Sequence, residues 1–310
     1  MSIIVIGSVN VDIVTYADRA PRPGESLTGH RYSMVLGGKG ANQSVAVARL
    51  GAPVHFIGRV GADSFGEFIR TRLAGLGVGP DHLAIDSQLP TGLAVIGIDA
   101  RGENAITVIP GANTGLAVEQ VETAFPLFAD VKVLLAQLEH PFSATLRAVE
   151  LARRAGALAI LDPAPVPTFP FEADTIRLFD ALTPNEIETE ALTGIAPVDI
   201  EAAAAAARRL RDTGLPLALV KMGARGVYVD GADFQGHIPP FPVKAIDTVA
   251  AGDCFAAGLA VALAEGMTTE SAVRFAAAAG ALACTKEGSS EAAPTRQEVE
   301  ALLTRNSRAS

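Results

Sequence analysis

Residues 247–253 read Asp-Thr-Val-Ala-Ala-Gly-Asp and precede an apolar run of helical type over residues 254–264. The small side chains of Ala250, Ala251 and Gly252 let backbone N–H groups approach a ligand closely. A helix start adds aligned donors and a positive dipole, so this turn predicts an anion site with Asp253 at its edge. That pairing suits phosphoryl transfer to an alcohol, because the carboxylate can accept the hydroxyl proton while the amides stabilise the transferred group. Taken alone, an N-cap aspartate on a tight turn explains the same residues.

A second glycine-rich stretch, residues 37–43, reads Gly-Gly-Lys-Gly-Ala-Asn-Gln and leads into a helical pattern. It is not a Walker A phosphate loop, which would need Gly where Ser33 stands and Ser or Thr where Gly40 stands. The loop can nevertheless bring backbone amides, the ammonium of Lys39 and the carboxamide of Asn42 against a polyhydroxylated ligand. An ordinary strand-to-helix turn is the alternative.

Asn185 and Glu188 follow Thr183 and Pro184, and Pro is favourable in a first helical turn. Their spacing of three puts both side chains on one helix face. Such a pair at the carboxyl end of a strand can hold Mg²⁺ through water and steer phosphates. An exposed acidic first turn, stabilised by the helix dipole, is the alternative.

Residues 221–226 read Lys-Met-Gly-Ala-Arg-Gly and come directly after an apolar strand pattern. Their two glycines are three apart, so the stretch is not the dinucleotide-binding fingerprint. A turn of this kind could cover the phosphates or ribose of a nucleotide, and a plain hairpin turn is the alternative.

Three further polar residues end strand patterns. Asn10 and Asp12 share one side of an extended chain after the first strand, and Glu139 ends the strand predicted over residues 131–138. Carboxylates and carboxamides at one sheet edge suit bidentate binding of sugar hydroxyls, although each could be a turn or cap residue.

Short apolar runs alternating with helical patterns position these residues. Buried strands are predicted over residues 3–6, 54–57, 131–138, 158–161 and 217–220, with helices near 65–76, 144–155 and 200–210. The alternation predicts an α/β fold with a doubly wound, mostly parallel sheet flanked by helices, and ligands at the carboxyl ends of the strands. Residues 12–36 and 92–110 break the alternation. They are hairpin-like segments that we expect to form a small β-sheet lid within a single domain over residues 1–310, with ordinary edge strands as the alternative.

Composition narrows the class of protein. The chain has 310 residues, 49% of them hydrophobic and 19% charged, with a net charge of −9 and two cysteines. The hydrophobic fraction excludes a disordered chain, and the longest uncharged run is too short and too interrupted to span a membrane. We expect no nucleic-acid partner because the chain is acidic without basic tracts. The two cysteines and an opening run too short for a signal peptide favour a cytoplasmic location.

The motifs occur in one order along nearly the whole chain: Asn10 and Asp12, residues 37–42, Glu139, Asn185 and Glu188, residues 221–226, and residues 247–253. This order resembles the ribokinase-type (PfkB) family of carbohydrate and nucleoside kinases. The Asp-Thr-x-Ala-Ala-Gly-Asp stretch with its helix marks the family strongly. The opening Gly-Ser-x-Asn-x-Asp with Gly-Gly-Lys-Gly-Ala-Asn-Gln is similar to its ribose-phosphorylating branch.

The resemblance implies transfer of the γ-phosphoryl of ATP to the primary 5-hydroxyl of D-ribose, with Mg²⁺. It makes Asp253 the general base and the amides of residues 250–253 the anion hole. The implied sugar-binding residues are Asn10, Asp12, Gly38, Lys39, Asn42, Ala94, Ile96, Glu139 and Asp253. The implied ATP-binding residues are Asn185, Lys221, Gly223, Ala224, Arg225, Gly226, Gly252 and Ala277, with Glu188 at the Mg²⁺ through water. It also implies a homodimer formed through the lid.

The resemblance further implies a monovalent cation, usually K⁺, beside the anion hole, held mainly by backbone carbonyls and one carboxylate. The corresponding positions are Asp247, Val249, Ala283, Lys286, Gly288 and Ala292. This chain departs from the pattern at two places. Ala292 stands where a Ser is common and can offer only its carbonyl, and Lys221 stands where a Thr is frequent and could reach a nucleotide phosphate.

Other substrates remain open on the same fold: deoxyribose, fructose, 2-keto-3-deoxygluconate, adenosine and pseudouridine. Nucleoside kinases usually stack the base on aromatic side chains, and the 5% aromatic content with no Trp disfavours them. A catalytically silent sugar or nucleotide sensor is the alternative from another class, and the intact Asp253 stretch disfavours it.

Overall fold

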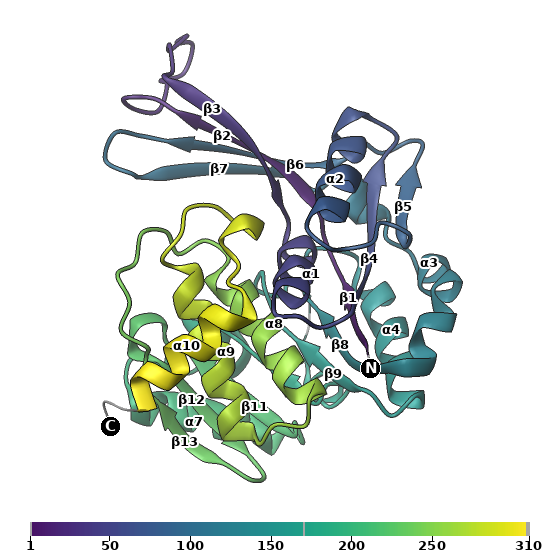
Figure 1. Ribbon diagram of the computed structural model, residues 1–310, viewed down its shortest axis with the longest axis vertical. Coiled ribbons are helices and arrows are strands. Elements are labelled where there is room, and N and C mark those ends of the chain that lie inside the picture. Colours follow the sequence, from purple (N-terminus) through teal and green to yellow (C-terminus); the bar gives the residue numbers. More distant parts are fainter. Residues whose placement is uncertain (1, 170, 308–310) are drawn as a thin grey trace.

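A nine-stranded sheet forms the centre of the computed structural model, which describes residues 2–169 and 171–307 (Figure 1). Its strand order is β13-β12-β11-β10-β9-β8-β1-β4-β5, and only the β11–β12 and β12–β13 pairs are antiparallel. Its strands are β1 (Ser2–Ile6), β4 (Val54–Gly61), β5 (Leu83–Asp86), β8 (Val131–Ala136), β9 (Leu158–Leu161), β10 (Ala181–Leu182), β11 (Leu217–Lys221), β12 (Val227–Gly231) and β13 (Gln235–Ile238). The continuous apolar runs follow from burial of the sheet on both faces.

Helices cover both faces of this sheet. One face carries α1 (Lys39–Arg49), α2 (Ser64–Gly75), α8 (Ala251–Ala264), α9 (Thr269–Ala283) and α10 (Arg296–Ser307). The other carries α3 (Val118–Thr123), α4 (Phe142–Arg154), α5 (Ala173–Ile176), α6 (Glu186–Thr193) and α7 (Ile200–Asp212). Four 3₁₀ turns complete the described part of the chain: η1 (Gly111–Gly115), η2 (Phe125–Asp130), η3 (Gly223–Arg225) and η4 (Ser290–Ala292).

Small residues let α8 and α9 lie close together. A Cβ on Gly258 would come within 2.9 Å of the Cα of Ala276, and the alanines around them are fully buried. This close packing accounts for much of the chain's alanine content and fixes the helix whose first turn carries Asp253.

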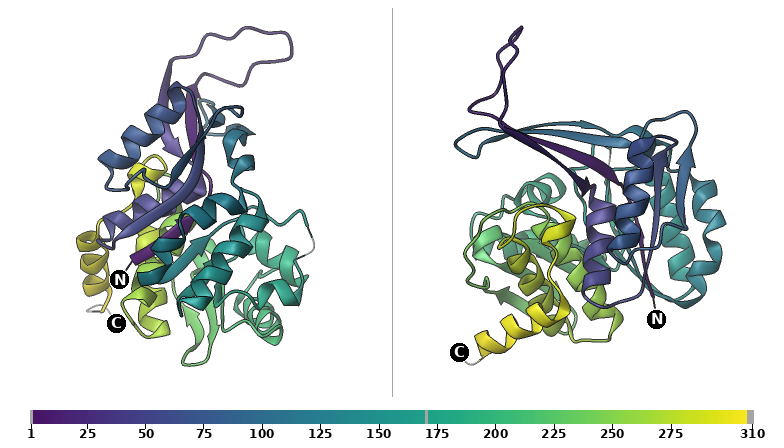
Figure 2. Two further views of the ribbon diagram at one scale, coloured as in Figure 1. Left: turned by 90° about the vertical axis from the view of Figure 1, so that its right-hand side faces the viewer. Right: turned by 45° about the horizontal axis from the view of Figure 1, so that its top comes forward.

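A second, four-stranded sheet stands off the body over the carboxyl edge of the main sheet (Figures 1 and 2). It consists of β2 (Asn10–Tyr16), β3 (Arg31–Gly37), β6 (Gly92–Ile98) and β7 (Asn104–Ile109), in the order β3-β2-β6-β7. Its register pairs Asp12 with Ala94 and Val14 with Ile96, so these four residues share one face. We call this sheet the lid sheet.

The predicted fold class is therefore confirmed. Two predicted element boundaries near the site differ from those in the structure. The helix predicted from residue 254 begins at Ala251, which puts Asp253 in its first turn. The strand predicted to residue 138 ends at Ala136, because the chain turns there and Leu138 N bonds to Ala164 O instead.

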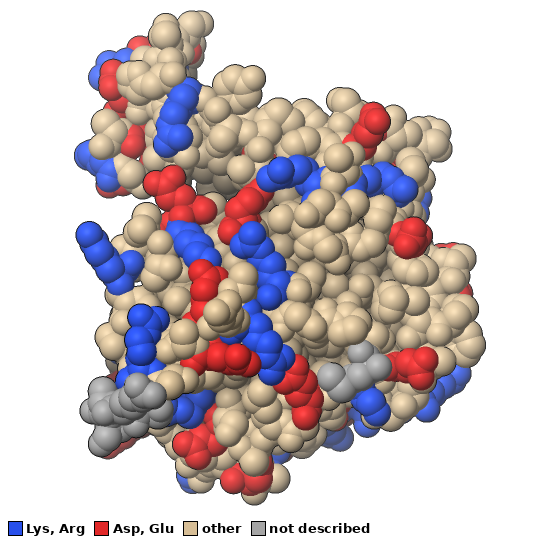
Figure 3. All heavy atoms as spheres, in the orientation of Figure 1, with Lys and Arg blue, Asp and Glu red and all other residues tan. Residues whose placement is uncertain are grey.

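The surface carries both signs of charge. On the face drawn in Figure 3, Lys and Arg side chains lie among those of Asp and Glu. Ion pairs join some charges of opposite sign, among them Arg72–Glu291 and Lys286–Glu298. Among the described residues, no helix is long and apolar enough to cross a membrane.

Candidate active site

Asp253 lies at the meeting point of α1 and α8 and is 5% exposed. Its two carboxylate oxygens accept from the side-chain amides of Asn42, at 2.9 Å, and Gln43, at 3.1 Å. Burial raises the pKa of the Asp253 carboxyl, Lys39 works against that rise, and Asp162 adds to it. Asp253 is thus a buried carboxylate held in one orientation by two donors.

The start of α8 offers backbone donors beside this carboxylate. Ala251 N donates to Thr248 O and Cys254 N to Ala250 O, whereas the amides of Gly252 and Asp253 have no acceptor within residues 2–169 and 171–307. Ala250, at the N-cap, has φ 60°, the one positive φ of a non-glycine residue in those ranges. A left-handed backbone at alanine costs about 1 kcal/mol or more, so the turn is held in place by its surroundings. Free backbone N–H groups at a helix N-terminus can bind an anion, so the geometry is compatible with the anion site predicted here.

Lys39 begins α1 and points into the same region. Gly38 before it has φ 87°, and a Cβ there would lie 2.7 Å from the Cα of Val9, so the turn requires glycine. Burial alone would lower the pKa of the Lys39 ammonium, but Asp253, Asp162, Glu139 and Glu188 outweigh it and the pKa is raised. Lys39 is therefore a fixed positive charge among four carboxylates.

Glu139 and Asp12 line the side of the site under the lid sheet. Glu139 Oε2 accepts from Ser8 Oγ at 2.5 Å and from the amide of Lys39 at 3.2 Å. Asp12 Oδ1 is buried without a hydrogen-bond partner among the described residues. Burial, together with Glu139 and Glu291, raises the pKa of Asp12 to about 7. An unpartnered carboxylate oxygen is an acceptor that a ligand hydroxyl could satisfy.

Asn185 and Glu188 form a capping box at the start of α6. Glu188 oxygens accept from the backbone N of Asn185 at 2.8 Å and from its Nδ2 at 2.9 Å, and Asn185 Oδ1 accepts from Glu188 N at 2.9 Å. Glu188 is 4% exposed, so the alternative of a solvent-exposed acidic turn is wrong for this residue. Burial raises its pKa, as does Asp162, and Lys221 opposes the rise.

A cavity of about 630 Å³ opens on the other side of Asp253. It brings together most residues of the predicted nucleotide set, namely Asn185, Lys221, Gly223, Ala224, Gly226, Gly252 and Ala277, with Lys39, Glu188 and Asp253 at one end. Most of its wall is backbone and small or apolar side chains. Its size and lining suit a nucleotide.

The turn at residues 221–226 joins the antiparallel strands β11 and β12 through η3, so it is a hairpin turn that also lines the cavity. Lys221 Nζ lies 3.0 Å from Asp162 Oδ1. Arg225 is outside the lining: its guanidinium donates to Val198 O and lies 3.4 Å from Glu186.

The six positions predicted to hold a monovalent cation lie in two stretches of the chain, one before α8 and one from the end of α9 to η4. The Asp247 carboxylate joins the two stretches, because it accepts from Val249 N at 3.0 Å and from Gly288 N at 3.1 Å. Ala283 is the last residue of α9, Lys286 N beyond it donates to Ala283 O, and Ala292 lies in η4. Arg49 of α1 donates to the carbonyls of Glu291 and Ala293 on either side of Ala292.

Sequence reasoning missed three residues that belong to this arrangement. Asp162, 1% exposed, follows β9 and accepts from Lys221, from Thr183 at 3.1 Å and from Gln43 at 3.3 Å. Gln43 thereby bridges Asp162 and Asp253. Asn113, in η1, bonds to Asn10 at 2.8 Å. Asp162 carries the signal that identified Glu139, a carboxylate after a buried strand, while Asn113 has no such signal.

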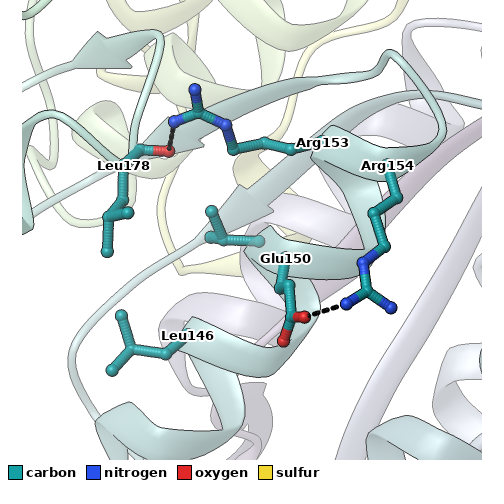
Figure 4. A pocket seen from close by; sticks show the side chains of 6 residues that line it. Leu146, Glu150, Arg153, Arg154 and Leu178 are labelled. Carbon is teal, nitrogen blue, oxygen red and sulfur yellow. Dashed lines mark hydrogen bonds and ion pairs between the residues drawn. The ribbon is translucent and has the colours of Figure 1, made fainter.

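A second cavity, of about 510 Å³, lies against α4 (Figure 4). It is lined by Leu146, Val149, Glu150, Arg153, Arg154 and Leu178. Its charged groups are paired with one another or with backbone, as in the Glu150–Arg154 ion pair at 2.5 Å. It contains none of the residues singled out from the sequence.

The chain is similar to a known protein family, to curated proteins and to solved structures. A family model described as pfkB family carbohydrate kinase matches residues 1–296. Ribokinase of Haemophilus influenzae is 40% identical over 297 residues, covering 96% of both chains. Deoxyribokinase of Salmonella typhi is 33% identical over 307 residues, covering 99% of this chain and 100% of the relative. The structure of Arabidopsis thaliana ribokinase complexed with ribose and ATP superposes with a TM-score of 0.90 at 32% identity, covering 97% of this chain and 98% of that one.

Proposed function

This chain belongs to the pfkB family of carbohydrate kinases, and from that premise we propose that it transfers the γ-phosphoryl of ATP to the primary 5-hydroxyl of D-ribose. The observation that carries the proposal is the junction at α8. A buried carboxylate and two unsatisfied backbone amides adjoin a nucleotide-sized cavity on one side and a cluster of hydroxyl-binding groups on the other.

Asp253 is the general base of this proposal. Its raised pKa makes it a better proton acceptor than an exposed aspartate, and Asn42 and Gln43 hold its oxygens in place. It accepts the proton of the attacking hydroxyl while the backbone amides of the turn stabilise the charge on the transferred group. Within residues 250–253 these are the amides of Ala250, Gly252 and Asp253, because that of Ala251 donates to Thr248 O. The ammonium of Lys39 adds positive charge at the same end of the cavity.

The sugar is assigned to residues of the lid sheet and of the body beneath it. They are Asn10, Asp12, Gly38, Lys39, Asn42, Ala94, Ile96 and Glu139. Support comes from the unpartnered Asp12 oxygen and from the register that aligns Ala94 and Ile96 with Asp12 on one face. The lid sheet would then exclude water from the reacting groups.

ATP is assigned to the 630 Å³ cavity, with its phosphates toward Lys221, Asn185 and the start of α8, and Ala277 near the base. Arg225 lies outside the lining and has no part in this assignment. The residues fit Mg²⁺ held through water by Glu188, because each carboxylate oxygen accepts one hydrogen bond from Asn185 and keeps a lone pair for a metal-bound water. Bound Mg²⁺ supplies neutralisation of phosphate charge.

A monovalent cation, K⁺, is assigned to Asp247 and to carbonyls of Val249, Ala283, Lys286, Gly288 and Ala292. The residues fit it in kind, since the Asp247 carboxylate joins the two stretches by accepting from Val249 N and Gly288 N, and oxygen ligands of this kind suit a hard cation. The test is to measure turnover in K⁺, in Na⁺ and in tetramethylammonium, and equal rates in all three would remove this part of the proposal.

A coupled assay of ADP release tests the main proposal. We expect the highest kcat/KM for D-ribose within a panel of ribose, 2-deoxyribose, fructose, 2-keto-3-deoxygluconate, adenosine and pseudouridine. Turnover of another sugar with none of ribose would overturn the assignment of ribose as the substrate, but the assignment of kinase activity would stand. Sugar binding without ADP release would instead support a sensor.

Deoxyribose is the second candidate, favoured by the similarity to a deoxyribokinase over the whole chain. The ratio of kcat/KM values for ribose and 2-deoxyribose decides between the two.

A homodimer through the lid sheet also belongs to this proposal. The sheet leaves large apolar side chains in solvent, with Tyr32 73%, Ile106 54% and Val108 55% exposed, and such a surface is typical of an interface. Light scattering should give a dimer for the native chain and a monomer for an Ile106→Glu/Val108→Glu variant. A monomeric native chain would contradict it.

We place the enzyme in the cytoplasm, consistent with its two free cysteines.

A further inference from the structure

Asn113 makes four hydrogen bonds at the base of the lid sheet and is 2% exposed. Its Oδ1 accepts from Val9 N at 2.9 Å. Its Nδ2 carries two hydrogens and faces three acceptors, so one hydrogen is shared: Val9 O lies at 3.1 Å, Pro110 O at 2.9 Å and Asn10 Oδ1 at 2.8 Å. Every side-chain atom of Asn113 that can hydrogen-bond is therefore engaged.

The polarity of these contacts leaves one orientation for Asn113. A backbone N–H can only donate and a backbone carbonyl can only accept, so Val9 N must meet Oδ1 while Val9 O and Pro110 O must meet Nδ2. The atom of Asn10 that faces Nδ2 must then be its acceptor, Oδ1. Consequently the Nδ2 group of Asn10 is directed away from Asn113, and it has no acceptor among the described residues.

We infer that Asn113 is a positioning residue that sets the hydrogen-bonding polarity of the sugar site through Asn10. This inference rests on the proposed function. Asn10 and Asp12 are two residues apart on β2 and share one face. With Asn113 in place, Asn10 presents a donor next to the Asp12 acceptor, a pair that matches sugar hydroxyls able to accept one bond and donate another.

The same contacts join the bases of three lid strands. Asn10 begins β2, Pro110 follows β7, and Gly92 begins β6. A Cβ on Gly92 would overlap with both Asn10 Oδ1 and Asn113 Nδ2, so glycine is required for the two amides to meet. The polarity of the sugar site is thus fixed by the fold before any ligand binds, which lowers the ordering cost of binding.

The test is a double-mutant cycle read by calorimetric binding of D-ribose. Asn113→Ala should weaken ribose binding about three- to tenfold in the native background, because one directed hydrogen bond is lost. In an Asn10→Ala background the same substitution should change ribose binding less than about twofold, because Asn113 acts through Asn10. KM for ATP should stay unchanged in both. Equal factors in the two backgrounds, or a parallel rise in KM for ATP, would overturn the inference.

Gln120→Ala is the matched control. Gln120 also uses a side-chain amide to join two segments, donating to Gly58 O at 2.5 Å and His82 O at 3.3 Å, away from the sugar residues. The Gln120→Ala substitution should lower Tm and leave ribose binding unchanged.

An Asn10→Asp variant keeps the inference testable if Asn113→Ala does not fold. The new carboxylate could still accept from Asn113 but would turn a second acceptor toward the sugar, so ribose binding should weaken about tenfold or more. Ribose binding equal to that of the native chain would overturn the inference. A native chain that binds no ribose would overturn the proposed function instead, so the two failures are distinguishable.

Discussion

The two sides of Asp253 are built differently. On the sugar side, hydrogen bonds hold polar side chains in fixed directions, as Asn113 holds Asn10 and Ser8 holds Glu139. On the nucleotide side, the wall is mostly backbone, glycine and alanine around an open cavity. The contrast indicates that the sugar is selected by the direction of side-chain donors and acceptors, and the nucleotide by shape, amides and a few charges. Substitutions on the two sides should therefore change different kinetic constants.

The largest effect is expected at the boundary itself. Asp253→Asn should lower kcat about 10²- to 10⁴-fold, because the general base is lost. The new amide also places an NH₂ against one of the donors from Asn42 and Gln43, so one hydrogen bond is lost as well. Ribose and ATP should still bind in calorimetry, and a kcat near that of the native enzyme would remove Asp253 as the base.

The second-largest effect is expected for a substitution on the sugar side of Asp253. Asp12→Asn should raise KM for ribose about 10- to 100-fold, since hydrogen bonds to a charged acceptor are lost, while KM for ATP stays within about twofold. A rise in both constants would contradict the separation of the two sides.

The same variant should gain stability above neutral pH. The fold raises the Asp12 pKa from 3.8 to about 7, so the contribution of this carboxyl to stability is present below pH 3.8 and lost as pH rises through 7. At pH 8 Asp12→Asn should therefore have a Tm higher by roughly 2–4 °C, a gain that is absent near pH 4. A Tm difference independent of pH would show that the charge is not its source.

A moderate effect is expected on the nucleotide side. Lys221→Met should raise KM for ATP about tenfold with KM for ribose unchanged, because a phosphate contact is lost. It also leaves the buried Asp162 without its cation, which destabilises the fold. Adding Asp162→Asn should restore Tm but not KM for ATP. Recovery of both would mean that Lys221 serves only to neutralise Asp162.

The smallest effect is expected for Arg225→Ala. Its guanidinium donates to Val198 O and pairs with Glu186, which lines the cavity, but Arg225 itself does not line it, and exposed pairs of this kind contribute little. KM for ATP should change less than twofold. A tenfold rise would show that the guanidinium turns toward the nucleotide.

The sequence predicted the strands, the order of the motifs and the position of most cavity residues, because several of these residues lie where buried strands end at one sheet edge. Glu139, Asp162 and Asn185 follow the neighbouring strands β8, β9 and β10, and Lys221 ends β11, a relation that local pattern contains. The sequence could not predict that Glu188 is buried or that Gln43 bridges Asp162 and Asp253, since both depend on how separate βα units pack. The role of Asn113 depends on contacts 103 and 104 residues away, which no local spacing encodes.

The most direct test of the central claim is the identity of the product. The native chain, ATP and D-ribose should give ribose 5-phosphate in ³¹P and ¹³C NMR, and 5-deoxyribose should bind without being phosphorylated. A phosphate on O1, or phosphorylation of 5-deoxyribose, would contradict the assignment of the primary 5-hydroxyl as the group that Asp253 deprotonates.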